Sequence, residues 1–263
     1  MARPRRLAAL LMLAVLAVSG CAEGTAASPG TEGQAAPSGL SGSLTVYAAA
    51  SLAVVLDEIA EAFEAENPGV EVRPISYDGS TTLVTQLVAG ASADVFASAD
   101  ETSMADVVAA GLARDPQVFA SNTLVIVVPA GNPAGIRRLA DLAADDATVV
   151  LCAPRVPCGT ASHTLLAAAG VSLVPASAEQ NVTAVLTKVA AGEADAGLVY
   201  ATDALGRSDV ETIIPEGASD VVNRYPIVAL TDAPDPEVAA AFVRFTQSDA
   251  ARRLLAGAGF GPA

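Results

Sequence analysis

The sequence predicts an α/β protein, and three features indicate this class. Short apolar runs of four or five residues recur along the chain, at 124–128, 148–151, 197–200 and 226–230, after a further expected strand at 93–97. Segments with the apolar period of an amphipathic helix lie between most of them. Gly, Pro and Asn mark many of the boundaries. Apolar strands that alternate with helices are typical of parallel sheets covered by helices on both faces.

The first elements follow each other closely. A strand is expected at 44–49, and the apolar residues from Leu52 onward then recur with the helical period. Asn67-Pro68-Gly69 ends this helix. A strand over 70–75 and a helix over 81–89 come next. We expect the rest of the chain to continue the same alternation.

One sequence pattern occurs twice and predicts two lobes. Residues 89–100 and residues 191–203 each contain a glycine, an Ala-Asp pair, an apolar strand and a second aspartate. Two similar α/β units that face each other form a cleft, and ligands bind such sheets at the carboxyl ends of their strands. Chance similarity in an alanine-rich chain is the alternative explanation.

The N-terminus predicts export. Three arginines among the first six residues precede an apolar run at 7–18, and Ser19-Gly20-Cys21 follows. The run is shorter than the roughly 20 residues that span a bilayer as a helix. This pattern predicts a signal peptide, residues 1–20, that is removed. The cysteine resembles that of the bacterial lipoprotein lipobox, which implies a lipid on Cys21 and a membrane anchor; an incidental cysteine is the alternative.

The composition between the signal and the first strand predicts a tether. Residues 21–43 are mostly Gly, Ala, Ser, Pro and Thr, with almost no large apolar group. Such a stretch buries too little surface to fold by itself. We therefore expect an anchor, a flexible linker and a globular body that begins at residue 44.

Charge excludes one class of partner. The chain has 14 basic and 29 acidic residues, a formal net charge of −15, and no Trp. An acidic surface repels nucleic acid and anionic lipid headgroups. No nucleic-acid partner is expected, and we expect a monomer.

Two further cysteines predict a disulfide. Cys152 and Cys158 bracket a loop with two prolines, and paired thiols outside the cytoplasm tend to oxidise. A zinc site that adds His163 is the alternative. Its C-x5-C-x4-H spacing fits no usual zinc pattern and has no fourth ligand nearby.

Four predicted helices begin with small or hydroxyl-bearing residues. They start near Ser51, at 79–82, at 156–160 and at 180–183. Ser51 follows a strand directly and is a candidate N-cap. The free N–H groups of a first helical turn bind anions, and the helix dipole adds to this preference. Four such starts divided between two lobes indicate an anion site.

The motifs at these positions resemble those of the periplasmic molybdate-binding proteins of ABC importers. The similar segments run in order from 44 to 263 and include Tyr-Ala-Ala-Ala-Ser-Leu at 47–52, Gly-Ser-Thr-Thr-Leu-Val-Thr-Gln-Leu at 79–87, Val-Pro-Cys-Gly at 156–159 and Gly-Leu-Val-Tyr-Ala-Thr-Asp-Ala at 197–204. The resemblance implies a binding protein, not an enzyme, that captures molybdate or tungstate for an ABC permease. It implies no cofactor, and molybdenum would enter only within the oxyanion, without direct protein ligands.

The resemblance also implies an architecture. It is the type II periplasmic-binding-protein fold, in which two α/β lobes, each a mostly parallel sheet flanked by helices, close on the ligand. Lobe I is expected to comprise 44–123 and 228–263, and lobe II 124–227.

Five ligand-binding residues follow from the resemblance. Ser51 and Ser80 would donate hydroxyl and backbone N–H groups from lobe I. Cys158 and Val182 would donate backbone N–H groups from lobe II, and Tyr200 would donate its phenol. Cys158 departs from the family, which usually has alanine there, but a backbone donor tolerates the change.

Asp78 is a second departure, beside Ser80, where a small neutral residue is common. A carboxylate facing a dianion would repel it by several kcal/mol at a low effective dielectric, so Asp78 is expected to point to solvent. If it faced the ligand it could accept a proton from phosphate, which leaves phosphate open beside sulfate as an alternative ligand. The other alternative is a serine hydrolase that uses Ser51, His163 and an aspartate, although no G-x-S-x-G motif is present.

Overall fold

The computed structural model describes residues 39–263. The predicted signal peptide, Cys21 and most of the predicted tether lie outside these residues. Within 39–263 no helix combines the length and apolar character needed to cross a membrane. Residues 41–43, which the composition assigned to the tether, instead belong to a strand, β1 (Ser41–Leu44), that pairs in parallel with β3 (Gly69–Val72).

The first of two five-stranded sheets defines lobe I. Its strand order is β4 (Ser76–Asp78), β2 (Val46–Ala49), β5 (Val95–Ala97), β12 (Asn223–Ala229) and β6 (Gln117–Asn122). β2 runs parallel to β4 and β5, and β12 runs antiparallel to β5 and β6. The expected strand at 44–49 is split at Thr45, where the backbone N–H donates to the Asp94 carboxylate at 2.7 Å.

The second sheet defines lobe II and repeats this pattern. Its order is β9 (Ser177–Glu179), β8 (Val149–Cys152), β10 (Ala196–Tyr200), β7 (Leu124–Pro129) and β11 (Val210–Ile213). β8 runs parallel to β9 and β10, and β7 runs antiparallel to β10 and β11. In each sheet four strands therefore run in one direction and a single connecting strand, β12 or β7, runs opposite to them, so the sheets are mixed and mostly parallel, as predicted.

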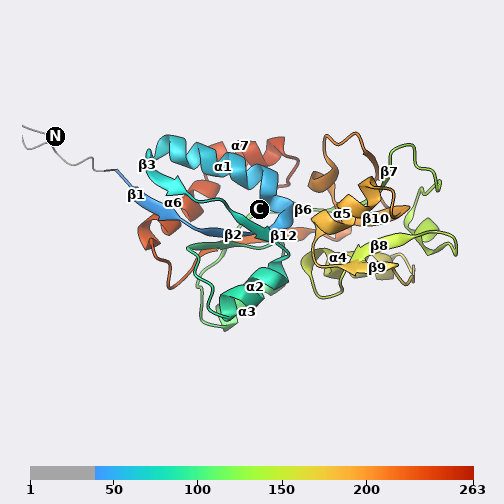
Figure 1. The fold of residues 1–263 in the computed structure, drawn as a ribbon, viewed down its shortest axis with the longest axis horizontal. Helices are drawn as coiled ribbons and strands as arrows, with labels where there is room; N and C mark the ends of the chain where they lie inside the picture. The colour runs from blue at the N-terminus through green and yellow to red at the C-terminus, as the bar shows by residue number, and fades with distance from the viewer. Residues whose placement is uncertain (1–38) are drawn as a thin grey trace, which may run out of the picture. The chain divides into compact units, whose positions relative to one another are not determined.

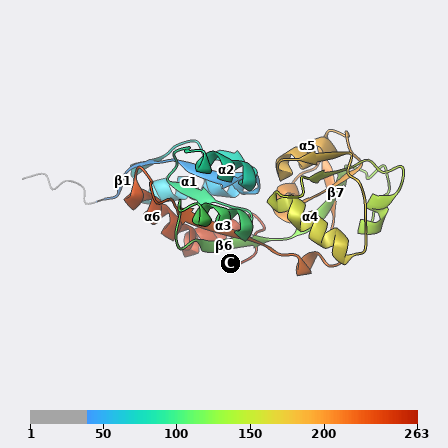
Figure 2. The same ribbon diagram turned by 90° about the horizontal axis from the view of Figure 1, so that it is seen from below.

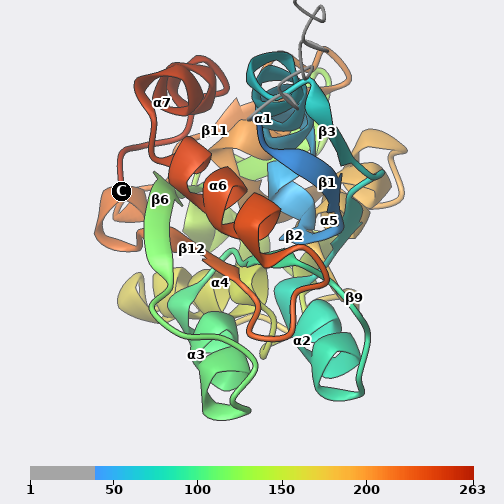
Figure 3. The ribbon, with the colours of Figure 1, turned by 90° about the vertical axis from the view of Figure 1, so that its left-hand side faces the viewer.

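Helices cover both faces of the lobe I sheet (Figures 1 and 3). α1 (Ala53–Glu66), α6 (Pro236–Thr246) and α7 (Asp249–Gly257) pack together on one face. Phe63 of α1 lies edge-on to Phe242 of α6, with ring centroids 5.2 Å apart. The other face carries two helices, α2 (Ser80–Val88) and α3 (Glu101–Ala109).

Lobe II has two longer helices and several short turns. Its α-helices are α4 (Pro157–Ala168) and α5 (Val182–Ala190), which pack against β8 and β10. The short 3-10 turns of the described chain are η1 (Ala50–Leu52) in lobe I and η2 (Leu139–Ala143), η3 (Ala201–Ala204) and η4 (Ala218–Asp220) along the lobe II segment.

The chain passes between the lobes twice (Figure 2). It leaves lobe I after β6 and enters β7 within two residues, and it returns ahead of β12. All of β12 pairs with lobe I strands, so residues 223–227 lie in lobe I, whereas the sequence placed the boundary at 228. The sequence pattern of β12 had no clear start, since Asn223 and Arg224 precede its apolar part.

The repeated sequence pattern forms equivalent structures in the two lobes. The carboxylate of Asp94, just before β5, accepts the backbone N–H of Thr45 at 2.7 Å. The carboxylate of Asp195, just before β10, accepts that of Thr148 at 2.8 Å. Each aspartate therefore ties the start of a central strand to the segment that leads into its parallel neighbour.

Candidate functional site

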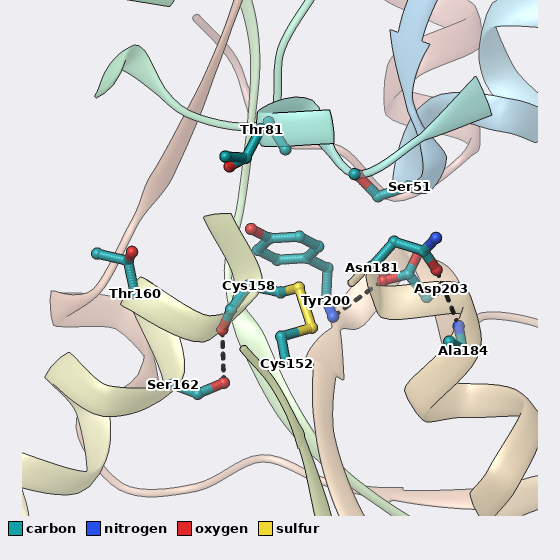
Figure 4. The surroundings of a disulfide bond; sticks show 12 residues. Ser51, Thr81, Cys152, Cys158, Thr160, Ser162, Asn181, Ala184, Tyr200 and Asp203 are labelled. Carbon is teal, nitrogen blue, oxygen red and sulfur yellow. Dashed lines mark hydrogen bonds between the residues drawn. A yellow bond between two sulfur atoms is a disulfide. The ribbon is translucent and has the colours of Figure 1, made fainter. Parts of the chain in front are cut away.

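One small cavity lies between the lobes, where strands β2, β4, β8 and β9 end and helices begin. It brings together all five residues that the sequence singled out, Ser51, Ser80, Cys158, Val182 and Tyr200. The other residues that line it are Ala49, Ala50, Asp78, Gly79, Ala99, Pro157, Gln180 and Asn181. Figure 4 shows Ser51 and Tyr200 beside the disulfide at this site.

Ser51 lies in η1, the short turn that joins β2 to α1. It is not an N-cap, as the sequence suggested, because no side chain caps either η1 or α1. Its Oγ instead lies 3.1 Å from the hydroxyl of Tyr225 on β12. This contact holds the Ser51 hydroxyl at the edge of the cavity.

Ser80 is the first residue of α2 and is almost fully buried, with 1% of its surface exposed. Its Oγ accepts the backbone N–H of Ala99 at 3.0 Å. An N–H group can only donate, so the Ser80 hydroxyl hydrogen stays available for a ligand. The N–H groups at the start of α2 have no partner within the helix.

The lobe II donors lie at the starts of α4 and α5. Cys158 is the second residue of α4, within the predicted helix start at 156–160, and Val182 is the first residue of α5. Asn181 caps α5 by accepting the Ala184 N–H at 3.0 Å. Cys158 is bonded to Cys152 at the end of β8, so the disulfide links the first turn of α4 to the sheet.

Tyr200 ends β10 and is 1% exposed. Burial raises the pKa of its phenol well above 10, and the nearby Tyr225, Asp203 and Asp100 raise it further. The phenol therefore stays protonated at neutral pH and can donate. Its oxygen accepts a hydrogen bond from the Asn223 side chain at 2.9 Å.

Asp78 does not point to solvent as expected. It lines the cavity, and its Oδ1 accepts both the Gly79 N–H at 2.7 Å and the Asn181 Nδ2–H across the cleft at 3.0 Å. The carboxylate thus has donors from both lobes, which offset its charge. The partner of Asp78, Asn181, could not be found from the sequence, because it lies 103 positions away in the other lobe.

The lobes meet closely beside this hydrogen bond. A Cβ atom added to Gly79 would lie 2.2 Å from the carbonyl oxygen of Gln180. The Thr81 hydroxyl donates to the carbonyl of Arg155 at 3.1 Å. The described structure is therefore closed around the cavity.

The cavity is neutral apart from Asp78. Of the described residues that line it, none is Lys or Arg. What remains is a set of hydroxyls and backbone N–H groups at helix starts. Such donors suit an anion that carries no proton.

A family model and a curated relative cover this whole region. The sequence matches the model of bacterial extracellular solute-binding proteins over residues 44–261. It is 48% identical over 221 residues to the molybdate-binding protein ModA of Mycobacterium tuberculosis, which covers 83% of this chain and 84% of that protein. The chain belongs to the bacterial extracellular solute-binding protein family. The resemblance inferred from the motifs is thereby confirmed.

Solved structures agree on the fold of this solute-binding protein. The periplasmic molybdate-binding protein of Azotobacter vinelandii matches with a TM-score of 0.72 at 22% identity, over 84% of this chain and 99% of that one. The sulfate-binding protein SubI of Mycobacterium tuberculosis matches with a TM-score of 0.74 at 22% identity, over 84% and 87%. These similarities confirm the predicted two-lobed α/β fold.

The cavity of the solute-binding protein is small. Its volume is about 20 Å³. In this closed form it has room for one small ligand. A larger hollow of about 730 Å³ lies along residues 133–147, but none of the predicted site residues lines it.

The hydrolase and metal alternatives have no geometric support in residues 39–263. Ser51 hydrogen-bonds Tyr225, while His163 is exposed on α4 and does not line the cavity. No group of three His, Cys, Asp or Glu side chains in the described part of the chain could hold a metal ion. Cys152 and Cys158 are bonded to each other instead.

Proposed function

We propose that this protein captures molybdate, and also tungstate, and delivers it to the permease of an ABC importer. The observation that carries the proposal is the closed cavity in which Ser51, Ser80, Tyr200 and the starts of α4 and α5 converge without any cation. The ModA relative, at 48% identity, supports molybdate as the ligand. The lack of Lys and Arg among the described lining residues allows release to a transporter, because no ion pair with the anion has to be broken.

The chemistry of the donors favours a fully deprotonated oxyanion. Phosphate carries a proton at neutral pH and needs an acceptor, whereas molybdate, tungstate and sulfate need only donors. Asp78 is the one carboxylate at the cavity, and its Oδ1 already accepts from Gly79 and Asn181. Its Oδ2 could still accept a proton from phosphate, so phosphate stays a second candidate behind molybdate, which the ModA relative supports.

Sulfate is the nearer competitor, since the sulfate-binding protein SubI shares the fold. Sulfate has the charge of molybdate but shorter bonds. Donors held around the larger tetrahedron would lie too far away to close on it. We propose a non-enzymatic role, since the site holds donors and no assembled nucleophile and base.

The proposed setting is outside the cytoplasm. Cleavage before Cys21 and lipidation of that residue would anchor the domain to the cell membrane as a monomer. Replacement of Cys21 with Ser should leave export intact and abolish labelling by radioactive palmitate. A wild-type protein that takes up no label would remove the lipid anchor from this proposal.

Calorimetric titration of the domain with four anions tests the ligand. Molybdate and tungstate should bind one-to-one, and sulfate and phosphate should bind much more weakly. Equal affinity for sulfate and molybdate would show that the assignment of the ligand is wrong. Turnover of generic esters, with labelling of Ser51 by a serine-directed reagent, would instead favour the hydrolase.

A further inference from the structure

Two buried asparagines lie side by side where the chain passes between the lobes. Asn122 is the last residue of β6 and Asn223 is the first of β12, and the two are register partners in the antiparallel pair. Their exposed fractions are 5% and 8%. Buried amides are almost always hydrogen-bonded, so their partners indicate what they do.

The contacts of Asn223 fix the direction of a hydrogen bond at Tyr200. Its Nδ2 donates to the carbonyl oxygen of Ala99 at 3.0 Å and to Oη of Tyr200 at 2.9 Å. A backbone carbonyl can only accept, so the atom that faces it must be the amide nitrogen. An amide nitrogen can only donate, so the Tyr200 oxygen must accept. The phenol hydrogen of Tyr200 then has to point away from Asn223, toward the cavity.

Asn122 is fixed by the same reasoning on the other side of the site. Its Oδ1 accepts the backbone N–H of Thr123 at 2.9 Å, and its Nδ2 donates to the Thr202 hydroxyl at 2.7 Å.

The hydroxyls of Tyr225 and Ser51 lie 3.1 Å apart, and either of them can donate. Ser80 resembles Tyr200 more closely, because its Oγ accepts the Ala99 N–H and leaves its own hydrogen for the ligand.

We propose that Asn223 is a positioning residue that makes the Tyr200 hydroxyl donate to the bound anion. Asn122, its register partner, instead bonds Thr123 and Thr202. With the Asn223 amide on one side of its oxygen, the Tyr200 hydroxyl directs its hydrogen at the ligand, and a protonated ligand oxygen placed there would meet this hydrogen instead of a lone pair. Asn223 thus favours a fully deprotonated oxyanion over one that carries a proton. This inference rests on the proposed function and extends it to specificity.

A double-mutant cycle measures the coupling. Titrations with molybdate compare the wild type with Asn223→Leu, Tyr200→Phe and the double variant. Asn223→Leu should weaken binding roughly tenfold and Tyr200→Phe roughly ten- to a hundred-fold, while the double variant should bind no more weakly than Tyr200→Phe alone. Asn67→Leu is the matched control, since Asn67 Nδ2 also donates to a backbone carbonyl, that of Phe63 at 2.9 Å, and should bind as the wild type does.

Two results of the cycle would overturn the proposal. One is wild-type affinity in a folded Asn223→Leu variant. The other is full additivity of Asn223→Leu and Tyr200→Phe, which would indicate a purely structural role for Asn223.

A spectroscopic measurement tests the hydrogen-bond direction without any asparagine variant. The Raman doublet of tyrosine differs between phenols that accept and phenols that donate. The wild-type spectrum minus that of Tyr200→Phe isolates Tyr200 among the four tyrosines of the chain. Without ligand it should be of the accepting type, and molybdate should shift it toward the type that both accepts and donates.

Failure of the role proposed for Asn223 and failure of the proposed function can be told apart. A donor-type doublet in the ligand-free protein would overturn the role of Asn223 even if Asn223→Leu does not fold. A wild type that fails to bind molybdate would overturn the proposed function, and the Raman spectrum would still decide the direction of the Tyr200 hydroxyl.

Discussion

The two lobes share a scaffold but bring different chemistry to the cavity. Each has a five-stranded sheet in which two parallel pairings are followed by two antiparallel ones. In lobe I the helices that meet the cavity carry Ser51 and Ser80. In lobe II the equivalent helix starts carry Cys158 and Val182, which have no hydroxyl, and a tyrosine at the end of β10 provides the side-chain donor. The backbone supplies the shared part of the site, and side chains supply the differences.

The starts of α2 and α5 show what this difference does. Gly79 precedes α2 without a capping side chain, whereas Asn181 caps α5 through its own Oδ1. The Asn181 Nδ2 then reaches Asp78 across the cleft. Lobe I has no side chain at Gly79, so lobe II can approach it closely. This explains why the two similar lobes close without a clash.

The largest expected effect comes from adding a side chain at Gly79, which removes this difference between the lobes. Its backbone angles, φ −60° and ψ 134°, suit alanine, but a Cβ there would lie 2.2 Å from the Gln180 carbonyl oxygen. Gly79→Ala should therefore keep the thermal stability of the ligand-free domain and keep the lobes about an ångström too far apart. We expect molybdate affinity to fall ~100-fold or more in calorimetry.

Gly257→Ala is the matched control for Gly79→Ala. Gly257 ends α7, and an added Cβ would contact nothing within 4 Å. This variant should bind molybdate as the wild type does. Wild-type affinity in Gly79→Ala as well would mean that the closed contact is not required for binding.

Much of this site could be predicted from the sequence because its donors lie where strands end and helices begin. Hydrophobic period and small residues locate such boundaries, and the family motifs then identify Ser51, Ser80, Cys158, Val182 and Tyr200. The roles of Asp78 and Asn223 could not be predicted, because each depends on a residue far away in the chain. The Asp78 partner, Asn181, lies 103 positions away, and Asn223 contacts Ala99 across 124 positions.

Sequence patterns also predicted strands poorly where the strands begin with polar or small residues. β12 starts with the polar residues Asn223 and Arg224, ahead of the apolar run expected at 226–230, so the predicted lobe boundary at 228 falls inside this strand. β1 contains Ser41, Gly42 and Ser43, whose composition is typical of a linker. Its register with β3 and the Ser43 N–H bond to Asp235, 192 positions away, hold it in place.

The next largest expected effect on molybdate affinity comes from removing side-chain donors, and it can be compared with a variant that keeps its backbone donor. Ser51→Ala and Ser80→Ala each remove a hydroxyl that would donate to an anion, a bond worth about 1.5–3 kcal/mol. Molybdate should bind each variant roughly ten- to a hundred-fold more weakly. Val182→Ala keeps its backbone N–H, and its affinity for molybdate should fall by less than about threefold. An unchanged affinity in the Ser51→Ala, Ser80→Ala double variant would show that the site lies elsewhere.

A smaller effect is expected from the disulfide, which joins two residues of lobe II. Replacing both Cys152 and Cys158 with alanine removes a short covalent loop, which the chain-entropy model values at about 2 kcal/mol. The free energy of unfolding in urea should fall by about that amount. Affinity should fall only a few-fold, because position 158 still offers its backbone N–H. Equal urea midpoints for the wild type with and without reductant would contradict a stabilising role.

The smallest expected effect comes from Asp203, whose counterpart in lobe I is Asp100. Asp100 caps α3 through the Ser103 N–H, whereas Asp203 accepts the Tyr200 N–H at 3.0 Å. Burial raises the pKa of Asp203 from 3.8 to about 7, and the Tyr200 hydrogen bond opposes part of this rise. Between these two values the folded protein holds a proton that the unfolded chain has released. This stabilisation is complete below about pH 4 and is lost as the pH rises through 7.

Asp203→Asn removes this titration and keeps an acceptor for the Tyr200 N–H. Since a unit of pKa shift corresponds to about 1.4 kcal/mol and Asp203 retains some exposure to solvent, we expect a change of about 1–2 kcal/mol. Urea unfolding of the ligand-free domain from pH 5 to pH 8 should show the wild type losing stability relative to Asp203→Asn. Parallel pH profiles of the two proteins would mean that Asp203 ionises as an ordinary surface carboxylate does, and that the lobes do not differ at this position.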